Sequence, residues 1–312
     1  MVGSAIVRLL KSAEPTATIV TAERDQLDLR NQSATASFFS KNKIDHVYLA
    51  AAKVGGIMAN SSRPAEFLYD NLAIETNVIH SSYVSGVKRL LFLGSSCIYP
   101  KHSQQPIPEE ALLTGPLEQT NEAYAIAKIS GIMLCKSYNY QYGCDFRCLM
   151  PTNLYGPNDN FDPYTSHVIP GLITKLYKAR CENERSVTLW GTGSPLREFL
   201  HVDDLASACV QAMRVSQSRY SKHSGSFGHV NAGSGTEVSI KELALLLKKI
   251  IGFEGDISWD TTKPDGTQRK LLNSNRLTSL GWKPSVALCD GLATTVTWYV
   301  DNRIRPDIPY RT

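Results

Sequence analysis

Residues 89–96 read RLLFLGSS, and this stretch decides the fold class. The apolar run Arg89–Leu93 predicts a short buried strand, which Gly94–Ser96 ends with small and polar residues. Long amphipathic segments at Pro64–Ser85 and Ala123–Tyr142 predict a helix on each side of it in the sequence. Alternation of apolar strands with long helices favours a parallel sheet covered on both faces.

The same alternation continues in both directions along the chain. We expect helices at Met1–Lys11, Ala34–Asn42 and Ile240–Ile251, and strands at Thr18–Thr21, His46–Ala52 and Asp145–Met150. Small and polar residues cluster after three of the strands, at 53–56, 94–97 and 151–157. In open parallel sheets ligands bind outside the carboxyl ends of the strands, so we expect the functional site there.

Composition excludes several classes of protein. Of 312 residues, 42% are hydrophobic and 20% charged, which is unlike a disordered chain. The net charge is only +4 with the basic residues dispersed, so we expect no nucleic-acid partner. No run of about 18 apolar residues occurs, so we expect no membrane span. Seven scattered cysteines suit reduced thiols in a cytoplasmic protein, and Cys144 and Cys148 lack the further ligands of a zinc site.

Tyr124 and Lys128 are the first pair that suggests catalysis. Their spacing places both side chains on one face of a helix, where an ammonium favours the phenolate and lowers the pKa of the phenol. Such a pair can exchange a proton with a carbonyl or an alcohol, and the Ser95 hydroxyl at a strand end can bond the same oxygen. The alternatives are an incidental pair on a surface helix and a serine-rich turn.

The chain resembles the extended short-chain dehydrogenase/reductase family, because Ser95, Tyr124 and Lys128 match the catalytic triad of that family. More narrowly, it is similar to the GDP-L-fucose synthase branch of that family, from Met1 to about Trp298. The matching blocks are AAAKVGGI at 50–57, GSSCIYP at 94–100, PTNLYGPNDN at 151–160, Ser166–Val168, REFLHVDD at 197–204 and KPDGTQRK at 263–270.

The resemblance implies an NADPH-dependent reaction in two stages on GDP-4-keto-6-deoxy-D-mannose. Cys97 would act as base and His167 as acid in the epimerisation at C3 and C5. Tyr124 would then protonate O4 as hydride reaches C4, with Lys128 and Ser95 assisting. A thiol and an imidazole titrate near neutral pH, which suits this task. From the residues alone, Cys97 is more often a small buried side chain and His167 an ordinary loop residue.

Cofactor choice stays open on the residues alone, because Glu23 favours NAD and the adjacent Arg24 favours NADP. The resemblance assigns the 2′-phosphate to Arg24 and therefore implies NADP(H). The cofactor-binding residues that it implies are Gly3, Arg24, Asp28, Leu29, Ser95, Lys128, Pro151, Asn153, Leu154 and His167.

The nucleotide-sugar end of the substrate needs cations for a diphosphate and a flat surface for a base. The resemblance implies that Lys175, Trp190, Arg197 and Asp265 contact the substrate. Trp190 could instead be a core residue. Arg197 could instead pair with Glu198 or Asp203.

The fold implied is a Rossmann-type doubly wound parallel sheet with a smaller α/β substrate domain. We expect the NADP-binding domain at 1–158, with about 198–232 returning to it, and the substrate domain at 159–197 and 233–312. An internal first strand and most of the glycine-rich turn are expected to be lacking, since only Gly3 precedes the first helix. Cofactor binding and folding would both suffer from that lack.

Two other interpretations of the chain remain open at this stage. One is a different nucleotide-sugar epimerase or dehydratase, which would keep Ser95, Tyr124 and Lys128 but need not have both Cys97 and His167. The other is a truncated, inactive paralogue that acts as a binding partner. We also expect a homodimer, formed through the helices at Pro64–Ser85 and Ala123–Tyr142.

Overall fold

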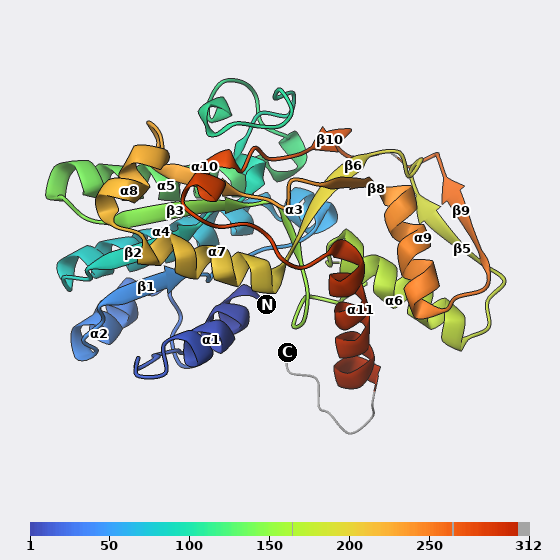
Figure 1. The fold of residues 1–312 in the computed structure, drawn as a ribbon, viewed down its shortest axis with the longest axis horizontal. Helices are drawn as coiled ribbons and strands as arrows, with labels where there is room; N and C mark the ends of the chain where they lie inside the picture. Colours follow the sequence, from blue (N-terminus) through green and yellow to red (C-terminus); the bar gives the residue numbers. More distant parts are fainter. Residues whose placement is uncertain (164, 264, 305–312) are drawn as a thin grey trace.

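The computed structural model of the protein describes residues 1–163, 165–263 and 265–304. Its larger part is a four-stranded parallel sheet in the order β1-β2-β3-β7, with helices on both faces (Figure 1). Its smaller part holds α6, α9 and α11 around the two-stranded sheet β5-β9. A third sheet, β10-β6-β4 with β8 antiparallel on β6, lies between these two parts.

The elements of the first half follow the predicted alternation closely. The helices are α1 (Val2–Ala13), α2 (Gln32–Lys41), α3 (Ile57–Ser62), α4 (Pro64–Val84) and α5 (Glu122–Tyr142), and the strands are β1 (His46–Leu49), β2 (Arg89–Leu93), β3 (Phe146–Pro151) and β4 (Asn153–Tyr155). Three single turns of 3₁₀ helix, η1 (Ser96–Ile98), η2 (Glu109–Ala111) and η3 (Gln119–Asn121), lie between β2 and α5. The α/β fold class is thereby confirmed.

The second half alternates in the same way but divides its strands among three sheets. The helices are α6 (Val168–Cys181), α7 (Val202–Arg214), α8 (Gln217–His223), α9 (Ile240–Ile251), α10 (Asn275–Ser279) and α11 (Leu288–Tyr299), which continues as a π-helical turn at Val300–Ile304. The strands are β5 (Ser186–Trp190), β6 (Leu196–His201), β7 (His229–Ala232), β8 (Glu237–Ser239), β9 (Asp256–Asp260) and β10 (Arg269–Lys270).

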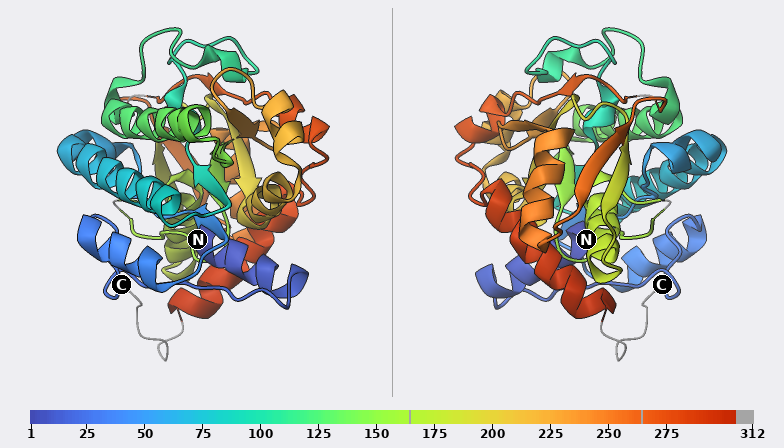
Figure 2. Two further views of the ribbon diagram at one scale, coloured as in Figure 1. Left: turned by 90° about the vertical axis from the view of Figure 1, so that its left-hand side faces the viewer. Right: turned by 90° about the vertical axis from the view of Figure 1, so that its right-hand side faces the viewer.

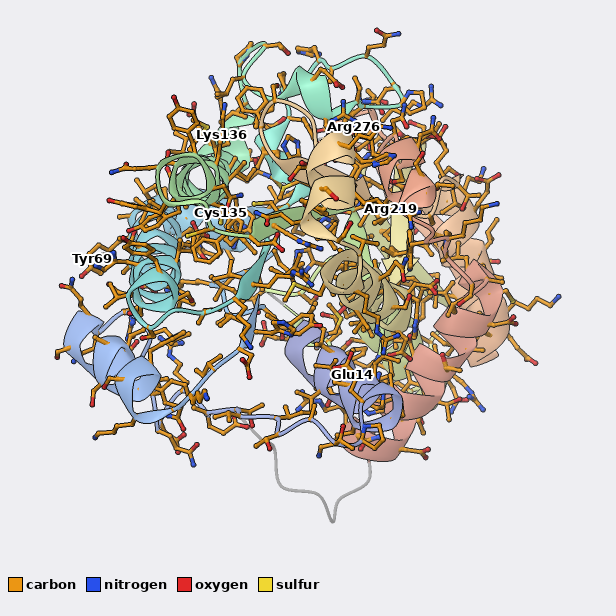
Figure 3. All side chains as sticks on the ribbon, turned by 60° about the vertical axis from the view of Figure 1, so that its left-hand side comes forward. Glu14, Tyr69, Cys135, Lys136, Arg219 and Arg276 are labelled. Atoms are coloured by element: carbon orange, nitrogen blue, oxygen red, sulfur yellow. The ribbon has the colours of Figure 1, made fainter. Side chains whose placement is uncertain are left out.

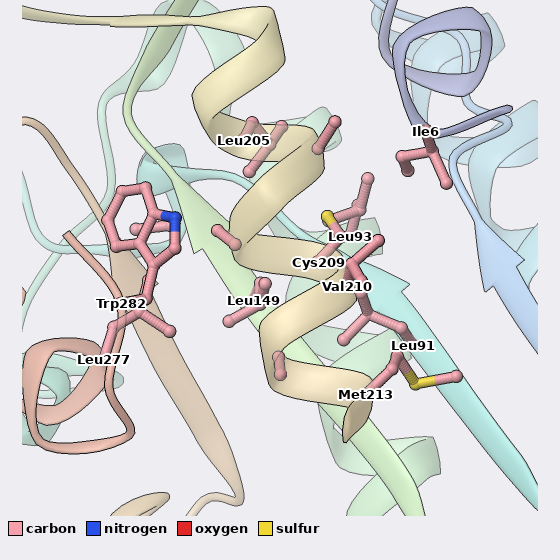
Figure 4. Packing of buried hydrophobic residues seen from close by; sticks show 14 of the residues in the cluster. Ile6, Leu91, Leu93, Leu149, Leu205, Cys209, Val210, Met213, Leu277 and Trp282 are labelled. Atoms are coloured by element: carbon pink, nitrogen blue, oxygen red, sulfur yellow. The ribbon is translucent and has the colours of Figure 1, made fainter. Parts of the chain in front are cut away.

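Residues Leu90–Leu93 of strand β2 are all apolar because the sheet is covered on both faces. Leu91 and Leu93 point into a core built with α1 and α7, part of which Figure 4 shows. Leu90 and Phe92 point the other way, into a core built with α2, α4 and α5. Figure 2 shows the two helical layers from the side. The register Leu93↔Leu149 then brings the ends of β2 and β3 together.

One edge of the sheet borders a groove. Strand β1 pairs with β2 on one side, and on the other it lines a groove of about 1530 Å³ together with α1 and residues 16–23. The predicted strand at Thr18–Thr21 is wrong, because these residues form no strand in the structure. The physical reason is the groove, which leaves the segment without a neighbouring strand to supply hydrogen bonds.

No helix in the described parts of the chain is long and apolar enough to cross a membrane. Within the same residues, no group of three or more His, Cys, Asp or Glu side chains could hold a metal ion. All seven cysteines are free thiols.

A buried histidine makes the fold sensitive to acid. His229 on β7 is fully buried, and its Nε2 lies 3.0 Å from the Tyr99 hydroxyl. Burial lowers its pKa from 6.5 to about 4. The unfolded chain therefore binds a proton in this window that the folded chain does not, so stability is full above pH 6.5 and falls as the pH drops towards 4.

The difference between the pKa values of His229 in the unfolded and folded chains corresponds to about 3 kcal/mol in the free energy of unfolding. We expect urea denaturation to show that wild type loses more stability than His229→Gln between pH 6.5 and 4, by a difference of this order. His102→Gln, at an exposed loop position, is the control and should leave the acid sensitivity unchanged. An equal loss in wild type and His229→Gln would contradict this assignment.

Candidate active site

The triad residues meet at the carboxyl end of β2. The chain leaves β2 at Gly94, and Ser95 then caps η1 by accepting a hydrogen bond from the Cys97 amide at 3.3 Å. Tyr124 lies in the first turn of α5, partly buried, with its ring edge-on to Phe67 and its hydroxyl hydrogen-bonded to Ser95. Ser95 and Tyr124 therefore lie close together at this strand end, and the prediction that both bond one substrate oxygen stays a prediction.

Lys128 lies one turn further along α5 and is almost completely buried. Its Nζ is 5.8 Å from the Tyr124 ring centroid and donates to the Leu93 carbonyl at 3.1 Å. The same Nζ lies 2.9 Å from a carboxylate oxygen of Glu75 on α4. Lys128 thus lies beside Tyr124 on α5 as predicted. The charge of Lys128 is balanced by Glu75, which no sequence motif indicated.

The pKa of Tyr124 differs from the sequence-based expectation. The structure raises it, chiefly by burial and further by the nearby Cys97 and Glu75, while the hydrogen bond from Ser95 opposes this. The prediction that Lys128 lowers this pKa is therefore wrong for the protein without ligands. The main physical reason is burial of the phenol, and the Glu75 carboxylate adds to it by offsetting the ammonium that would otherwise stabilise a phenolate.

Cys97 faces two polar groups contributed by other elements. The Asn121 side-chain amide donates to its sulfur at 3.2 Å, and the Lys270 ammonium lies 3.7 Å from it. An ammonium at this distance can balance the negative charge of a thiolate. Cys97 is only partly buried, so the alternative of a small core side chain does not describe it.

A cavity of about 670 Å³ lies beyond the carboxyl ends of these strands. Helix α3 with its flanking residues, the start of α6, the end of β5, strand β6 and residues 265–266 line it. His167, as the N-cap of α6, lies in its wall, and burial lowers the pKa of this imidazole. Asn153 and Leu154 also line it, and β3 leads directly into β4, which carries them. The cavity is thus joined through β4 to the end of β3, which lies beside the end of β2.

Trp190 lies on the rim of this cavity and not in the core. Its side chain is 63% exposed, and the Lys263 ammonium lies 5.8 Å from its ring centroid. The turn after it depends on Gly191 (φ +80°), where a Cβ would lie 2.3 Å from an oxygen of Asp265. Asp265 accepts from the Thr192 amide at 2.9 Å, which lowers the pKa of its carboxyl. The core alternative for Trp190 is therefore wrong.

Arg197 and Lys175 are placed differently. Arg197 on β6 lines the cavity, and burial lowers the pKa of its guanidinium while Asp265 opposes this. Its suggested partners are engaged elsewhere, since Asp203 pairs with Arg8 and Glu198 accepts the Gly235 and Leu272 amides. Lys175 on α6 is not among the described residues that line the cavity, and it donates to the Thr188 carbonyl.

The remaining predicted cofactor residues lie along the sheet edge and its loops. Gly3 lines the groove beside β1, and Arg24 is exposed in the loop after residue 23. Asp28 pairs with Arg30 at 2.8 Å, and hydrogen bonds from Arg30 lower its pKa to about 2. Leu29 packs against the core under α2 and α4. Pro151 ends β3 beside the β2 end.

Sequence reasoning missed Glu75, Asn121 and Lys270. Lys270 does lie within the quoted 263–270 block, so its place in a specific motif was an available signal. Pro264 of that block lies outside the described residues. Glu75 gave no such signal, because its partner Lys128 is on another helix and 53 positions further along the chain.

Comparison with known proteins agrees with this geometry. The model of the NAD dependent epimerase/dehydratase family matches residues 1–233. GDP-L-fucose synthase 1 of Arabidopsis thaliana is 58% identical over 302 residues, covering 97% of this chain and 91% of its own. GDP-L-fucose synthase of Escherichia coli (strain K12) is 50% identical over 306 residues, covering 98% and 95%. The NADP-bound crystal structure of a GDP-L-fucose synthetase from Naegleria fowleri is 31% identical, with TM-score 0.86 and coverage of 96% and 90%.

Proposed function

The chain belongs to the NAD dependent epimerase/dehydratase family, and from this premise we propose that it is a GDP-L-fucose synthase. It would convert GDP-4-keto-6-deoxy-D-mannose to GDP-L-fucose by epimerisation at C3 and C5 and reduction at C4. The observation that carries the proposal is the grouping of a Ser95–Tyr124–Lys128 triad with Cys97 at one strand end.

The residues present fit NADP(H) at the nicotinamide end. Lys128 and Tyr124 are held on one helix face beside Ser95, where a ribose hydroxyl and the reacting carbonyl can meet them. At the other end, the first backbone N–H groups of α1 have no partner within the helix and can bind phosphate, and Arg24 suits a 2′-phosphate. NADPH, when bound, supplies the hydride that is added at C4.

Tyr124 would act as the acid of the reduction. Its hydroxyl gives a proton to O4 as the carbonyl becomes an alcohol, and Ser95 donates a hydrogen bond to the same oxygen. The raised pKa of Tyr124 keeps this hydroxyl protonated at neutral pH, which is the form that an acid needs.

Cys97 and His167 would perform the epimerisation. A 4-keto group acidifies the hydrogens on C3 and C5, so a thiolate can remove them and a second group can return a proton from the opposite face. The Lys270 ammonium lies 3.7 Å from the Cys97 sulfur. In the free protein the lowered pKa keeps the His167 imidazole neutral, and the negative charge of a diphosphate in the same cavity would favour its protonated, donating form.

The cavity between α6 and β6 would hold the GDP group. Its wall offers a flat aromatic side chain in Trp190, a guanidinium in Arg197 and a hydrogen-bonding carboxylate in Asp265. Lys175 is on the same helix as the cavity wall, and its side chain would have to leave the Thr188 carbonyl to reach a phosphate. Trp190, Arg197, Asp265 and Lys175 are the four substrate contacts that we propose.

We expect Trp190→Ala to raise KM for the nucleotide sugar and leave kcat nearly unchanged. The exposed indole offers stacking of about 1–3 kcal/mol to a base, which is remote from the reacting carbon. This corresponds to a rise in KM of about tenfold or more. Steady-state kinetics would check it, with Leu245→Ala, an exposed apolar residue on α9, as the control. A fall in kcat at constant KM would contradict this role.

A homodimer is the assembly that we propose. Helices α4 and α5 pack together and leave apolar and aromatic side chains exposed, namely Tyr69, Val84, Ile126, Tyr140 and Tyr142. Figure 3 shows Tyr69 at the outer edge of the molecule. Such a face is typical of a protein–protein contact, and sedimentation would report the mass of a dimer.

The division of the chain stays a proposal as well. The part at 1–158 with 198–232 would bind NADP, and 159–197 with 233–312 would bind the nucleotide sugar. The free thiols support a reducing compartment, and we propose the cytoplasm.

Substrate choice separates this proposal from its rival, another nucleotide-sugar epimerase or dehydratase. We would follow NADPH oxidation with GDP- and UDP-linked 4-keto-6-deoxy sugars in parallel. The proposal expects oxidation with the GDP sugar and at least tenfold less with the UDP sugar. Preference for the UDP sugar would favour the rival, and oxidation of neither would favour an inactive binding protein.

A further inference from the structure

Glu75 is a buried carboxylate that the reaction described above does not use. It lies in the middle of α4, and its side chain is 2% exposed. Apart from Lys128, neither of its oxygens has a hydrogen-bond donor among the described residues. A buried acid with a single ionic partner is costly to keep, so its place beside a catalytic lysine calls for a reason.

The fold makes room for this carboxylate. Gly131 follows Lys128 by one turn on α5, and a Cβ there would lie 2.9 Å from Glu75 Oε2 and 2.4 Å from Phe92 Cζ. Any larger residue would therefore push Glu75 or Phe92 away. The Lys128 ammonium is held from three sides, by Glu75 at 2.9 Å, by the Leu93 carbonyl at 3.1 Å and by the Phe92 ring at 4.8 Å.

We propose that Glu75 is a positioning residue for the reduction: its carboxylate holds Lys128 against the end of β2 and keeps the Tyr124 hydroxyl protonated and ready to donate. The inference rests on the proposed function, because it gives Tyr124 the role of acid. A lysine without a counter-ion would favour the phenolate, which cannot protonate the ketone oxygen. Glu75 offsets that effect in the ground state.

The charged and titratable groups around this pair come from three elements. Cys97 faces Tyr124 from the η1 turn, and its electrostatic effect adds to that of Glu75 in raising the pKa of Tyr124. Cys135 on α5 is buried close enough to Glu75 for the two groups to interact electrostatically. Lys270 approaches Cys97 at 3.7 Å. Of these groups, Glu75 is the one bound directly to Lys128.

The test is the pH profile of ketone reduction by Glu75→Gln. Removing the negative charge lowers the pKa of Tyr124, so the alkaline limb, where the phenol loses its proton, should move to lower pH by about one unit or more. Glu66→Gln is the matched control, since Glu66 is on the same helix but pairs with Lys53 at the surface, and its limb should not move. Glu75→Asp keeps the charge and should restore most of the wild-type profile.

A second readout needs neither cofactor nor substrate. Ultraviolet absorbance reports phenolate, and subtracting the spectrum of a Tyr124→Phe variant isolates the contribution of Tyr124. In the Glu75→Gln background this contribution should appear at lower pH than in the wild-type background. If Glu75→Gln does not fold, Glu75→Asp should still move both readouts in the same direction by less. Unmoved or upward-shifted readouts overturn the proposal for Glu75. A wild-type protein that reduces no ketone overturns the proposed function instead.

Discussion

Tyr124→Phe should lower the rate of C4 reduction by about 10²–10⁴-fold, because it removes the group that protonates O4. The substitution deletes one oxygen atom and leaves the ring against Phe67, so folding and cofactor binding should change little. Stopped-flow measurement of NADPH oxidation with saturating GDP-4-keto-6-deoxymannose would give the effect on the chemical step directly.

The same variant should keep the first stage of the reaction. Exchange of the C3 and C5 hydrogens with deuterated solvent needs Cys97 and His167 but not the phenol, so NMR should still detect it. Tyr48→Phe provides a control, since Tyr48 is another partly buried tyrosine, on β1 and remote from α5. A Tyr124→Phe protein that reduces the ketone at the wild-type rate would contradict the role of this residue.

Cys97→Ala should show the opposite pattern, with solvent exchange at C3 and C5 reduced by about 10²–10⁴-fold. The loss follows because no other described residue places a thiol beside Lys270 and Asn121. The reduction machinery of Ser95, Tyr124 and Lys128 remains intact, so NADPH should still be oxidised, and the product should retain the unepimerised configuration.

A buried cysteine provides the control for this substitution. Cys209→Ala removes a thiol from α7, where the side chain belongs to the apolar core and not to the site. It should lower stability and leave exchange unchanged. Normal exchange in Cys97→Ala would remove the thiol from the mechanism and return the choice of base to the other groups around the cavity.

The sheet and its helices were predictable because local patterns encode them. The apolar run Arg89–Leu93 and the long helices beside it needed no knowledge of distant contacts, and α9 begins and ends at the predicted residues. Thr18–Thr21 was predicted as a strand on the same kind of evidence and failed. A strand also requires a neighbour to bond with, and the groove beside β1 supplies none.

The site was predictable in the parts that lie in motifs. Ser95, Cys97 and Tyr124 gather at one strand end, as parallel-sheet topology requires. The electrostatics were not predictable, because they depend on contacts between distant elements. Glu75 reaches Lys128 from another helix, and burial of the phenol, together with Cys97 and Glu75, raises the pKa of Tyr124 against expectation. The hydrogen bond from Lys175 to the Thr188 carbonyl could not be predicted for a similar reason, because no local pattern shows which strand faces its helix.

The central claim is that one site both epimerises and reduces the same sugar. The most direct measurement is NMR analysis of the product that the wild-type protein makes from GDP-4-keto-6-deoxy-D-mannose and NADPH in deuterated water. The account predicts GDP-L-fucose carrying deuterium at C3 and C5, with one NADPH oxidised for each sugar formed. A reduced sugar with unchanged configuration and no deuterium at these carbons would contradict it.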